Sequence, residues 1–516
     1  MLGRAFLWLE SQRSSTRMGV ILQVGARTLT SLLSLAWTPL LLASLGAPLY
    51  GQFLSFQAAA TLAGLGDLGM GGAIALRVGR YLGTGDQDRL LGFLANARAL
   101  FALLAAVMLL GFCLLSPWLP QWLGFKPLPG SGSLTLLFYA GGVWAALAII
   151  ASYINNVNHA AMNFNVLTVP LFLLGQGALV GHFICASNRW PLWVQFSSYL
   201  LGSLFSLIVS WWYLKRVQPA MGKLLPLQWN PRTTQELLTQ SGWMYLAGLG
   251  AFVYTTVDRL LINAGFWPAL VSVYQVNNKL CELALFVLSN LAFAALPKIT
   301  LWLSSSLPED RERVRREARR LNCAQTFVGL SAAFAYLMIN DRFIDLWLGP
   351  EMQAPLQLQI AFAASLAVTA GSDVGFQFSI RTGGRGLPFA GGLIGITALL
   401  NLALSFLAMK MGSFVGIACA TVLAQSIMSL VASRYLCNHL SLPWLRWAIQ
   451  SWGVPISCLF LASIARLFWP MKDAVDVAGL GLLYSALLAS AAWCLGITPA
   501  ALKHEAEIWI TMLRRR

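Results

Sequence analysis

Charged residues are scarce in this sequence, at 10% of 516 residues, whereas soluble domains carry about 25%. This scarcity excludes a soluble enzyme. Long polar stretches are scarce as well, because the longest, 215–240 and 304–320, are too short to fold around a core of their own. Any chemistry must therefore reside within the hydrophobic part of the chain.

The usual patterns of metal and redox sites are missing. The eight cysteines occur singly, without a CxxC pair or a histidine at ligand spacing. Isolated cysteines in apolar segments behave as small hydrophobic residues. No pair of a nucleophile and a base stands out either. We therefore expect no catalytic residues, no metal and no cofactor.

Long apolar stretches fill the chain instead, and 58% of its residues are hydrophobic. About 20 apolar residues cross a bilayer as a helix. The pattern predicts an all-α polytopic membrane protein with about 14 transmembrane helices. The predicted spans are 19–44, 49–76, 99–120, 134–155, 165–186, 192–213, 240–263, 268–297, 321–344, 357–380, 387–409, 413–433, 444–466 and 474–496.

The basic residues predict the orientation of these spans. Outside these spans, 25 of the 35 lysines and arginines fall in the two termini and in the loops on the same side, and four fall on the other side. Basic residues collect on cytoplasmic loops. We therefore expect both termini in the cytoplasm. The basic run 311–320 would suggest nucleic acid in a soluble protein, but between two spans it is expected to face anionic headgroups, and no nucleic acid is expected as a partner.

An internal repeat supports this layout. Tyr50 and Tyr274 follow similar turn segments at a separation of 224 residues, and the same offset aligns the loops 86–89 and 310–313. Six spans per repeat give two lobes of the same orientation around a cleft near the midplane. The predicted organisation is a cytoplasmic N-terminus (1–18), an N-lobe (19–213), a cytoplasmic linker (214–239), a C-lobe (240–433), two further helices (434–497) and a cytoplasmic basic tail (498–516).

Two charged residues lie deep in the first two spans. Arg27 is ten residues beyond Arg17, about 15 Å into the membrane, and Asp67 lies at a similar depth in the second span. A charge at this depth costs about 2.5–3.5 kcal/mol on insertion scales. The two residues either pair with each other or face a cavity, and both can hold at once.

Further polar residues lie in the seventh and tenth spans. Asp258 and Arg259 are adjacent, so they point about 100° apart and cannot face one partner. Asp373 lies between two glycines, a spacing that is typical of close helix packing. Each carboxylate is a candidate for ion coupling.

The eighth span carries the largest polar cluster. Lys279 and Glu282 are three residues apart on one face, with Asn277 and Asn278 beside them and Gln275 one turn before. Such a stripe is not expected to face lipid. It predicts either the lining of a wet cavity or a Lys–Glu pair that neutralises itself.

Several segments resemble a known family. They are Leu45–Phe53, Gly66–Gly71, the basic loop that follows, Asp258–Asn263, Val273–Gln275 and Leu296–Pro297. In both lobes these segments resemble the Wzx-type polysaccharide flippases, a branch of the multidrug/oligosaccharidyl-lipid/polysaccharide exporter superfamily. The resemblance implies a MATE-like fold and a bacterial inner membrane. It also implies that an oligosaccharide on undecaprenyl diphosphate, such as an O-antigen, exopolysaccharide or capsule repeat unit, crosses to the outer leaflet by alternating access. A polymerase and a chain-length regulator of the same pathway are the implied partners.

The charges in the spans suit this substrate. Arg27, Arg259 and Lys279 offset the charge of a diphosphate, and Asn277 and Asn278 are candidate contacts. The candidates for coupling to an ion gradient are Asp67, Asp258, Glu282 and Asp373.

Three alternatives remain open. A drug or organic-cation antiporter of the same superfamily also fits carboxylates in a cleft, but not basic residues facing it. A lipid II flippase also has fourteen spans, although its first-lobe signature is missing here. A membrane polysaccharide polymerase or ligase would need a longer outer loop than the dozen or so residues near 120–133 and 345–356.

Overall fold

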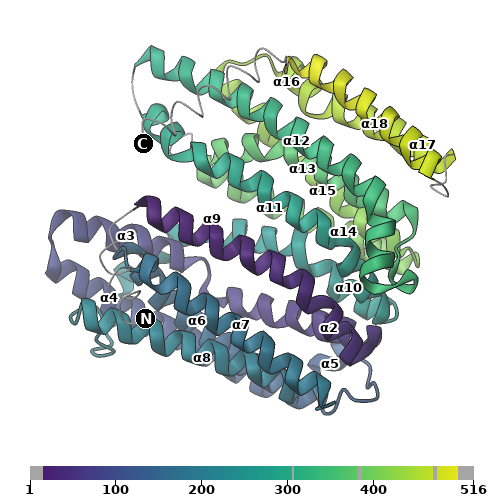
Figure 1. The fold of residues 1–516 in the computed structure, drawn as a ribbon. Coiled ribbons are helices and arrows are strands. Elements are labelled where there is room, and N and C mark those ends of the chain that lie inside the picture. Colours follow the sequence, from purple (N-terminus) through teal and green to yellow (C-terminus); the bar gives the residue numbers. More distant parts are fainter. Residues whose placement is uncertain (1–15, 305–306, 382–385, 469–473, 498–516) are drawn as a thin grey trace, which may run out of the picture. The chain divides into compact units, whose positions relative to one another are not determined.

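The computed structural model describes residues 16–304, 307–381, 386–468 and 474–497, and these residues form only helices and their connections (Figure 1). The predicted cytoplasmic tail 498–516 and most of the N-terminal segment 1–18 lie outside this range. Among the described residues, eleven helices are long and apolar enough to cross a membrane, or twelve if a bent helix counts as one span. The predicted class of an all-helical membrane protein is confirmed.

The predicted number of fourteen spans exceeds the twelve that the described residues contain when the bent helix is counted, for two reasons. The first helix, α2 (Thr16–Gly64), contains the first predicted span and the first part of the second, and Gly46 marks the bend between them with φ 74° and ψ 160°. Only glycine adopts this backbone conformation readily. In addition, α11 (Ala269–Ser304) coincides with the eighth predicted span, but the side chains at 289–298 are not described.

The second predicted span, 49–76, is wrong as a continuous helix. A short 3₁₀ turn, η1 (Leu65–Asp67), follows α2, and α3 (Met70–Thr84) starts a new helix. Between them Leu68 has φ 53° and Gly69 has φ 71°. Left-handed residues end an α-helix, and glycine adopts this conformation without steric cost. Asp67 therefore lies in a helix break instead of within a regular turn.

The chain divides into two units, Met1–Ser272 and Val273–Arg516. The predicted lobes meet earlier, in the linker 214–239, and the predicted organisation into lobes stays a prediction. After α3 the first unit contains α4 (Gln87–Leu115), α5 (Leu119–Trp122), α6 (Leu134–Ala160), α7 (Phe164–Ser187), α8 (Leu192–Val217), α9 (Pro231–Phe252), the π-helical turn η2 (Val253–Val257) and α10 (Asp258–Gly265).

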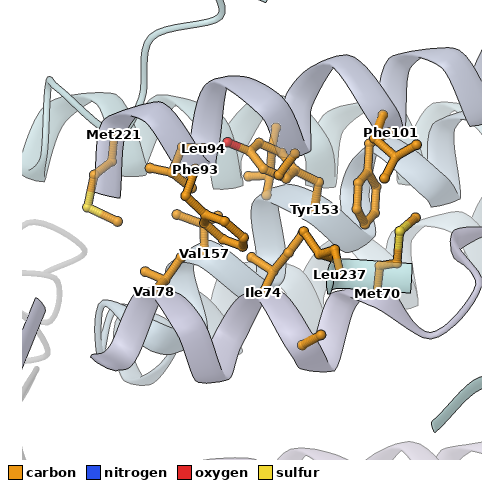
Figure 2. Close-up of a cluster of buried hydrophobic side chains, with 14 of the residues drawn as sticks. Met70, Ile74, Val78, Phe93, Leu94, Phe101, Tyr153, Val157, Met221 and Leu237 are labelled. Carbon is orange, nitrogen blue, oxygen red and sulfur yellow. The ribbon is translucent and has the colours of Figure 1, made fainter. Parts of the chain in front are cut away.

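The core at one end of the first unit joins five segments (Figure 2). Ile74 of α3, Phe93 of α4 and Val157 of α6 are buried together, and Figure 2 shows their side chains converging. Met221, after α8, and Leu237 of α9 belong to the same cluster. The connection to the seventh span is therefore part of this core.

Hydrogen bonds fix the same connection to α4. The Asn96 amide accepts from the backbone N–H of Asn230 at 2.6 Å and donates to Thr234 Oγ at 3.2 Å. Arg98 donates to the carbonyl of Lys223. Asn96 is 1% exposed and Arg98 8%. A buried polar group is costly without a partner, so these bonds specify the path of the linker.

The far end of the seventh span is also bound within the first unit. Ser272 donates to the carbonyl of Ala47 at 2.7 Å, and Asn263 donates to the carbonyl of Leu123 at 3.3 Å. At Gly51 an added Cβ would collide with the carbonyl of Pro268. This approach requires glycine, and it places the whole segment 231–272 in the first unit.

The second unit begins within α11. It continues through α12 (Pro308–Leu348), η3 (Pro350–Met352), α13 (Leu356–Ser379), α14 (Gly386–Lys410), α15 (Phe414–Leu440), α16 (Trp444–Ala448), the π-helical turn η4 (Ile449–Gly453), α17 (Val454–Phe468) and α18 (Ala474–Leu495). An ion pair of 2.6 Å between Arg466 of α17 and Asp341 attaches the thirteenth span to α12. Tyr484 of α18 donates to the carbonyl of Ala462 and joins the last two helices.

Candidate functional site

The helix break of the first unit holds the carboxylate of Asp67. Ser152 of α6 donates to Oδ2 at 2.6 Å, and the backbone N–H of Gly69 donates to Oδ1 at 3.0 Å. Asn156, one turn beyond Ser152, donates to the carbonyl of Ser152 at 2.8 Å. Asp67 thus joins the break to α6. The sequence analysis missed Ser152, for which the i, i+4 spacing to Asn156 in an apolar span is the available signal.

Arg27 does not form the ion pair with Asp67 that the sequence analysis considered. Its side chain is exposed on α2, and no ion pair joins it to any residue of the described ranges. It lies eleven residues from Thr16, about 16 Å along the helix. Ionised side chains within spans face a bundle interior or water. A contact of Arg27 with an anion stays a prediction.

The seventh span changes its helical geometry next to its charged pair. The π-helical turn η2 ends at Val257, and Asp258 and Arg259 open α10. Asp258 is 4% exposed, whereas Arg259 is half-buried and its carbonyl accepts from Ser55 at 3.2 Å. The two residues have different surroundings, as expected from their adjacent positions. Single π-turns are frequent at functional sites.

In the second unit, α11 carries a chain of polar contacts. Lys279 Nζ lies 2.9 Å from Glu282 Oε2, and Gln275 Nε2 donates to Glu282 Oε1 at 2.7 Å. The Glu282 side chain is 39% exposed and that of Lys279 is 17% exposed. The pair neutralises itself, which is one of the two readings of the sequence. Both side chains are partly exposed although they lie ten or more residues from the start of the 36-residue helix α11. Because charged groups are not stable in contact with lipid tails, this face of α11 requires water or a polar partner.

The two asparagines beside Lys279 differ in their surroundings. Asn277 is fully buried, donates to the carbonyl of Met352 at 2.8 Å and accepts from Asn340 at 2.9 Å. The Asn277 carbonyl also accepts from Tyr336 at 3.1 Å. Asn277 therefore holds α11 against α12 and η3. Asn278 is half-buried.

Asp373 lies at a second bend. The segments Leu356–Ala370 and Asp373–Ser379 of α13 meet at 42°. Gln377 donates to Asp373 Oδ1 at 3.3 Å and Gln325 of α12 to Oδ2 at 3.4 Å. The Asp373 carboxylate thus accepts a hydrogen bond from a neighbouring helix. The glycines on either side of Asp373 predict such close helix packing. The described residues contain no group of His, Cys, Asp and Glu side chains that could hold a metal ion.

Residues 134–354 match the family described as "Polysaccharide biosynthesis protein". The match extends from α6 to the loop before α13. No curated protein sequence matches the chain.

Solved structures share the fold over most of the chain. The lipid II flippase MurJ in an inward closed conformation aligns with a TM-score of 0.66 and 11% identity, covering 92% of this chain and 98% of its own. An inward-facing multidrug resistance MATE family transporter of the MOP superfamily aligns with a TM-score of 0.59 and 13% identity, and the alignment covers 79% of this chain and 94% of that one. A Vibrio cholerae MATE transporter aligns with a TM-score of 0.54 and 14% identity, and the alignment covers 85% of this chain and 98% of that one. Likenesses at these identities show the fold alone.

The family match over 134–354 agrees with the predicted resemblance, and the similar structures confirm the predicted MATE-like fold. The chain is thus a multi-pass membrane protein whose fold is similar to that of the lipid II flippase MurJ and of MATE transporters, and its residues 134–354 match the model of the polysaccharide biosynthesis protein family.

Proposed function

We propose that this protein transfers an oligosaccharide linked to undecaprenyl diphosphate from the cytoplasmic to the outer leaflet of a bacterial inner membrane by alternating access. The family over 134–354 supports a substrate from polysaccharide biosynthesis, and the fold supports a transporter. A headgroup with sugars and a diphosphate cannot cross hydrocarbon unaided, because polar and charged groups lose their hydration there.

The observation that carries this proposal is the state of Arg27. It is exposed within the first span and has no acidic partner among the described residues. Lys279, in contrast, is neutralised by Glu282, and Arg259 is half-buried. Arginine contacts phosphate oxygens with two parallel hydrogen bonds. Arg27 is therefore the first candidate for the diphosphate, and Lys279 follows if Glu282 releases it.

The proposed coupling to an ion gradient uses one of the four carboxylates. Asp67 and Asp373 lie at helix breaks and accept hydrogen bonds from neutral donors, Asp258 is buried beside a π-turn, and Glu282 is paired with Lys279. Broken helices in transporters are common places for ion sites. A carboxylate with neutral partners can take up a proton without leaving a cation unpaired. This favours Asp67 over Glu282, whereas Asp373 also interacts electrostatically with Arg381.

Transbilayer movement in proteoliposomes tests the proposal. A fluorescent oligosaccharide on undecaprenyl diphosphate is incorporated, and the intact protein is compared with Arg27→Ala, Arg27→Lys and, as a control, Lys126→Ala on the loop after α5. We expect movement with the intact protein, loss with Arg27→Ala, partial recovery with Arg27→Lys and no change with Lys126→Ala.

Two other outcomes would overturn the assignment. Transport of an organic-cation dye without movement of the lipid-linked oligosaccharide would favour a drug antiporter. Movement of lipid II in preference to other lipid-linked saccharides would favour a lipid II flippase. Equal movement by the intact protein and Arg27→Ala would remove Arg27 from the site.

A further inference from the structure

The first three turns of α12 carry arginines at one end of the second unit. The helix starts at Pro308, thirteen residues before the predicted span, and thirteen residues extend about 20 Å. Three of its arginines are paired with acids of the same helix: Arg313 with Asp310, Arg315 with Glu312 and Arg320 with Glu317. Arg311, Arg316 and Arg319 are exposed and have no such pair among the described residues.

Two more exposed arginines come from neighbouring elements. Arg434 of α15 lies over the Trp444 ring at 5.1 Å, and Arg446 belongs to α16. Arg315 donates to the carbonyl of Leu440 at 2.5 Å, so the start of α12 contacts the end of α15. We name these elements the basic corner. It comprises Arg311, Arg319, Arg434 and Arg446 with Trp444, Trp447 and Trp452.

The basic corner is built on a fixed support. Val314 and Ala318 of α12, Leu436 of α15 and Trp447 of α16 are buried in one hydrophobic cluster. Asn322 donates to Ser451 Oγ at 2.8 Å and ties α12 to η4. The arginines therefore project from elements whose backbone positions are set by packing and not from a loose loop.

The basic corner offers many donors and few acceptors. The indole N–H groups of Trp444, Trp447 and Trp452 are buried and have no acceptor among the described residues. The sequence contains no Asp or Glu between Asp373 and Asp473, so α15 and α16 supply no acid. Asp310, Glu312 and Glu317 of α12 are engaged with Arg313, Arg315 and Arg320, and Glu309 is exposed in the first turn of the helix. Buried donors without acceptors are rare and call for an explanation, such as a ligand.

We propose that the basic corner binds the phosphate of an anionic phospholipid headgroup. Phosphate oxygens accept hydrogen bonds from guanidinium and indole N–H groups alike. Tryptophans are enriched at the level of the headgroups, and clustered basic residues attract anionic lipids there. The site does not depend on the proposed substrate, since it uses none of the residues assigned to that substrate, Arg27, Arg259 and Lys279.

Lipid binding to the purified full chain in detergent tests this site. Phosphatidylglycerol is titrated and bound lipid is counted by native mass spectrometry, with phosphatidylcholine as the neutral comparison. The double variant Arg319→Gln and Arg446→Gln should weaken phosphatidylglycerol binding about thirtyfold, the effect of two charges near an anionic surface. The matched control, Arg80→Gln with Arg89→Gln, removes two exposed arginines of the first unit and should leave binding within a factor of about three.

A second variant addresses the indole donors. Trp447→Phe keeps an aromatic ring in the cluster but removes the N–H group, and binding should fall about tenfold, as for one hydrogen bond to a charged group. If the Trp447→Phe protein does not fold, the double variant Arg319→Gln and Arg446→Gln still tests the proposal. Both of its side chains are exposed, so their replacement should leave the fold intact. Unchanged binding in that double variant would overturn the proposal. So would equal binding of phosphatidylcholine, or binding of undecaprenyl diphosphate alone, which would make the basic corner a substrate site.

Discussion

Arginines at the corresponding ends of the two units are used in different ways. In the first unit, Arg77 pairs with Glu236 at 3.2 Å and Arg98 donates to the carbonyl of Lys223, so both contact the segment that enters the seventh span. In the second unit, Arg311 and Arg319 stay exposed beside α15. In the first unit these two arginines hold the connecting chain. In the second unit Arg311 and Arg319 face the surroundings, although the repeat gives both units a similar acidic and basic loop, Asp86–Arg89 and Asp310–Arg313.

The closure of the first unit is most easily broken at Gly51. Gly51→Ala places a Cβ against the carbonyl of Pro268 and should cost about 3 kcal/mol or more of the free energy of unfolding, because α2 and the segment before α11 must separate. The yield of folded protein and the Tm in detergent measure this. Gly79→Ala, with no neighbour within 4 Å of its Cβ, is the control. Equal Tm values for the two variants would show that 231–272 is not held as described.

The second largest loss of stability is expected where Asn96 of α4 binds the linker between α8 and α9. Asn96→Ala leaves the N–H of Asn230 and the hydroxyl of Thr234 without this buried partner and should cost about 2 kcal/mol. Arg319→Gln, in the second unit, should leave the Tm unchanged because its side chain is exposed. The difference between the two variants measures the contrast between the units. A similar loss in both would contradict it.

A double-mutant cycle in transport separates the two readings of the pair on α11. Lys279→Ala should slow movement of the lipid-linked oligosaccharide roughly tenfold, the effect of one charged hydrogen bond. If Lys279 acts on the substrate, adding Glu282→Ala will not restore the rate. Recovery in the double variant would instead mean that the single change only left Glu282 without its partner.

The smallest effect on stability is expected at Asp67. Asp67→Asn keeps a carbonyl oxygen for the N–H of Gly69 and a polar contact for Ser152, so the free energy of unfolding should change by less than about 1 kcal/mol. If Asp67 carries the coupled proton, transport in this variant will lose its dependence on a pH gradient. Transport that still follows the gradient would leave Asp373 and Asp258 as the candidates.

The spans could be predicted almost completely because long apolar stretches have one stable solution in a bilayer. Each of the fourteen predicted ranges coincides with helical residues. The break at 65–69 was not predicted, since hydropathy does not detect two left-handed residues, Leu68 and Gly69. The glycines around Asp67 were the available signal.

Side-chain partners were predicted only where they are local. Lys279 and Glu282 are three residues apart on one helix, and their contact follows from helix geometry. Asn277 is two residues from Lys279 and therefore points elsewhere, which helix geometry also predicts. The bonds of Asp67 to Ser152 and of Arg466 to Asp341 join residues distant in sequence, and no spacing rule specifies them.

The position of the seventh span also has a consequence for synthesis. The first unit closes only when residues 231–272 are present, because Asn96 and Gly51 find their partners there. At about 5–20 residues per second, the ribosome needs about 3 to 11 s to proceed from the end of α8 at Val217 to Ser272. When this interval begins, the six preceding spans are complete, but Asn96 still lacks Asn230 and Thr234, and Gly51 lacks its contact with Pro268 until nearly the end of it. A chaperone or insertase that acts on this protein should therefore be engaged longest just before the second unit is made.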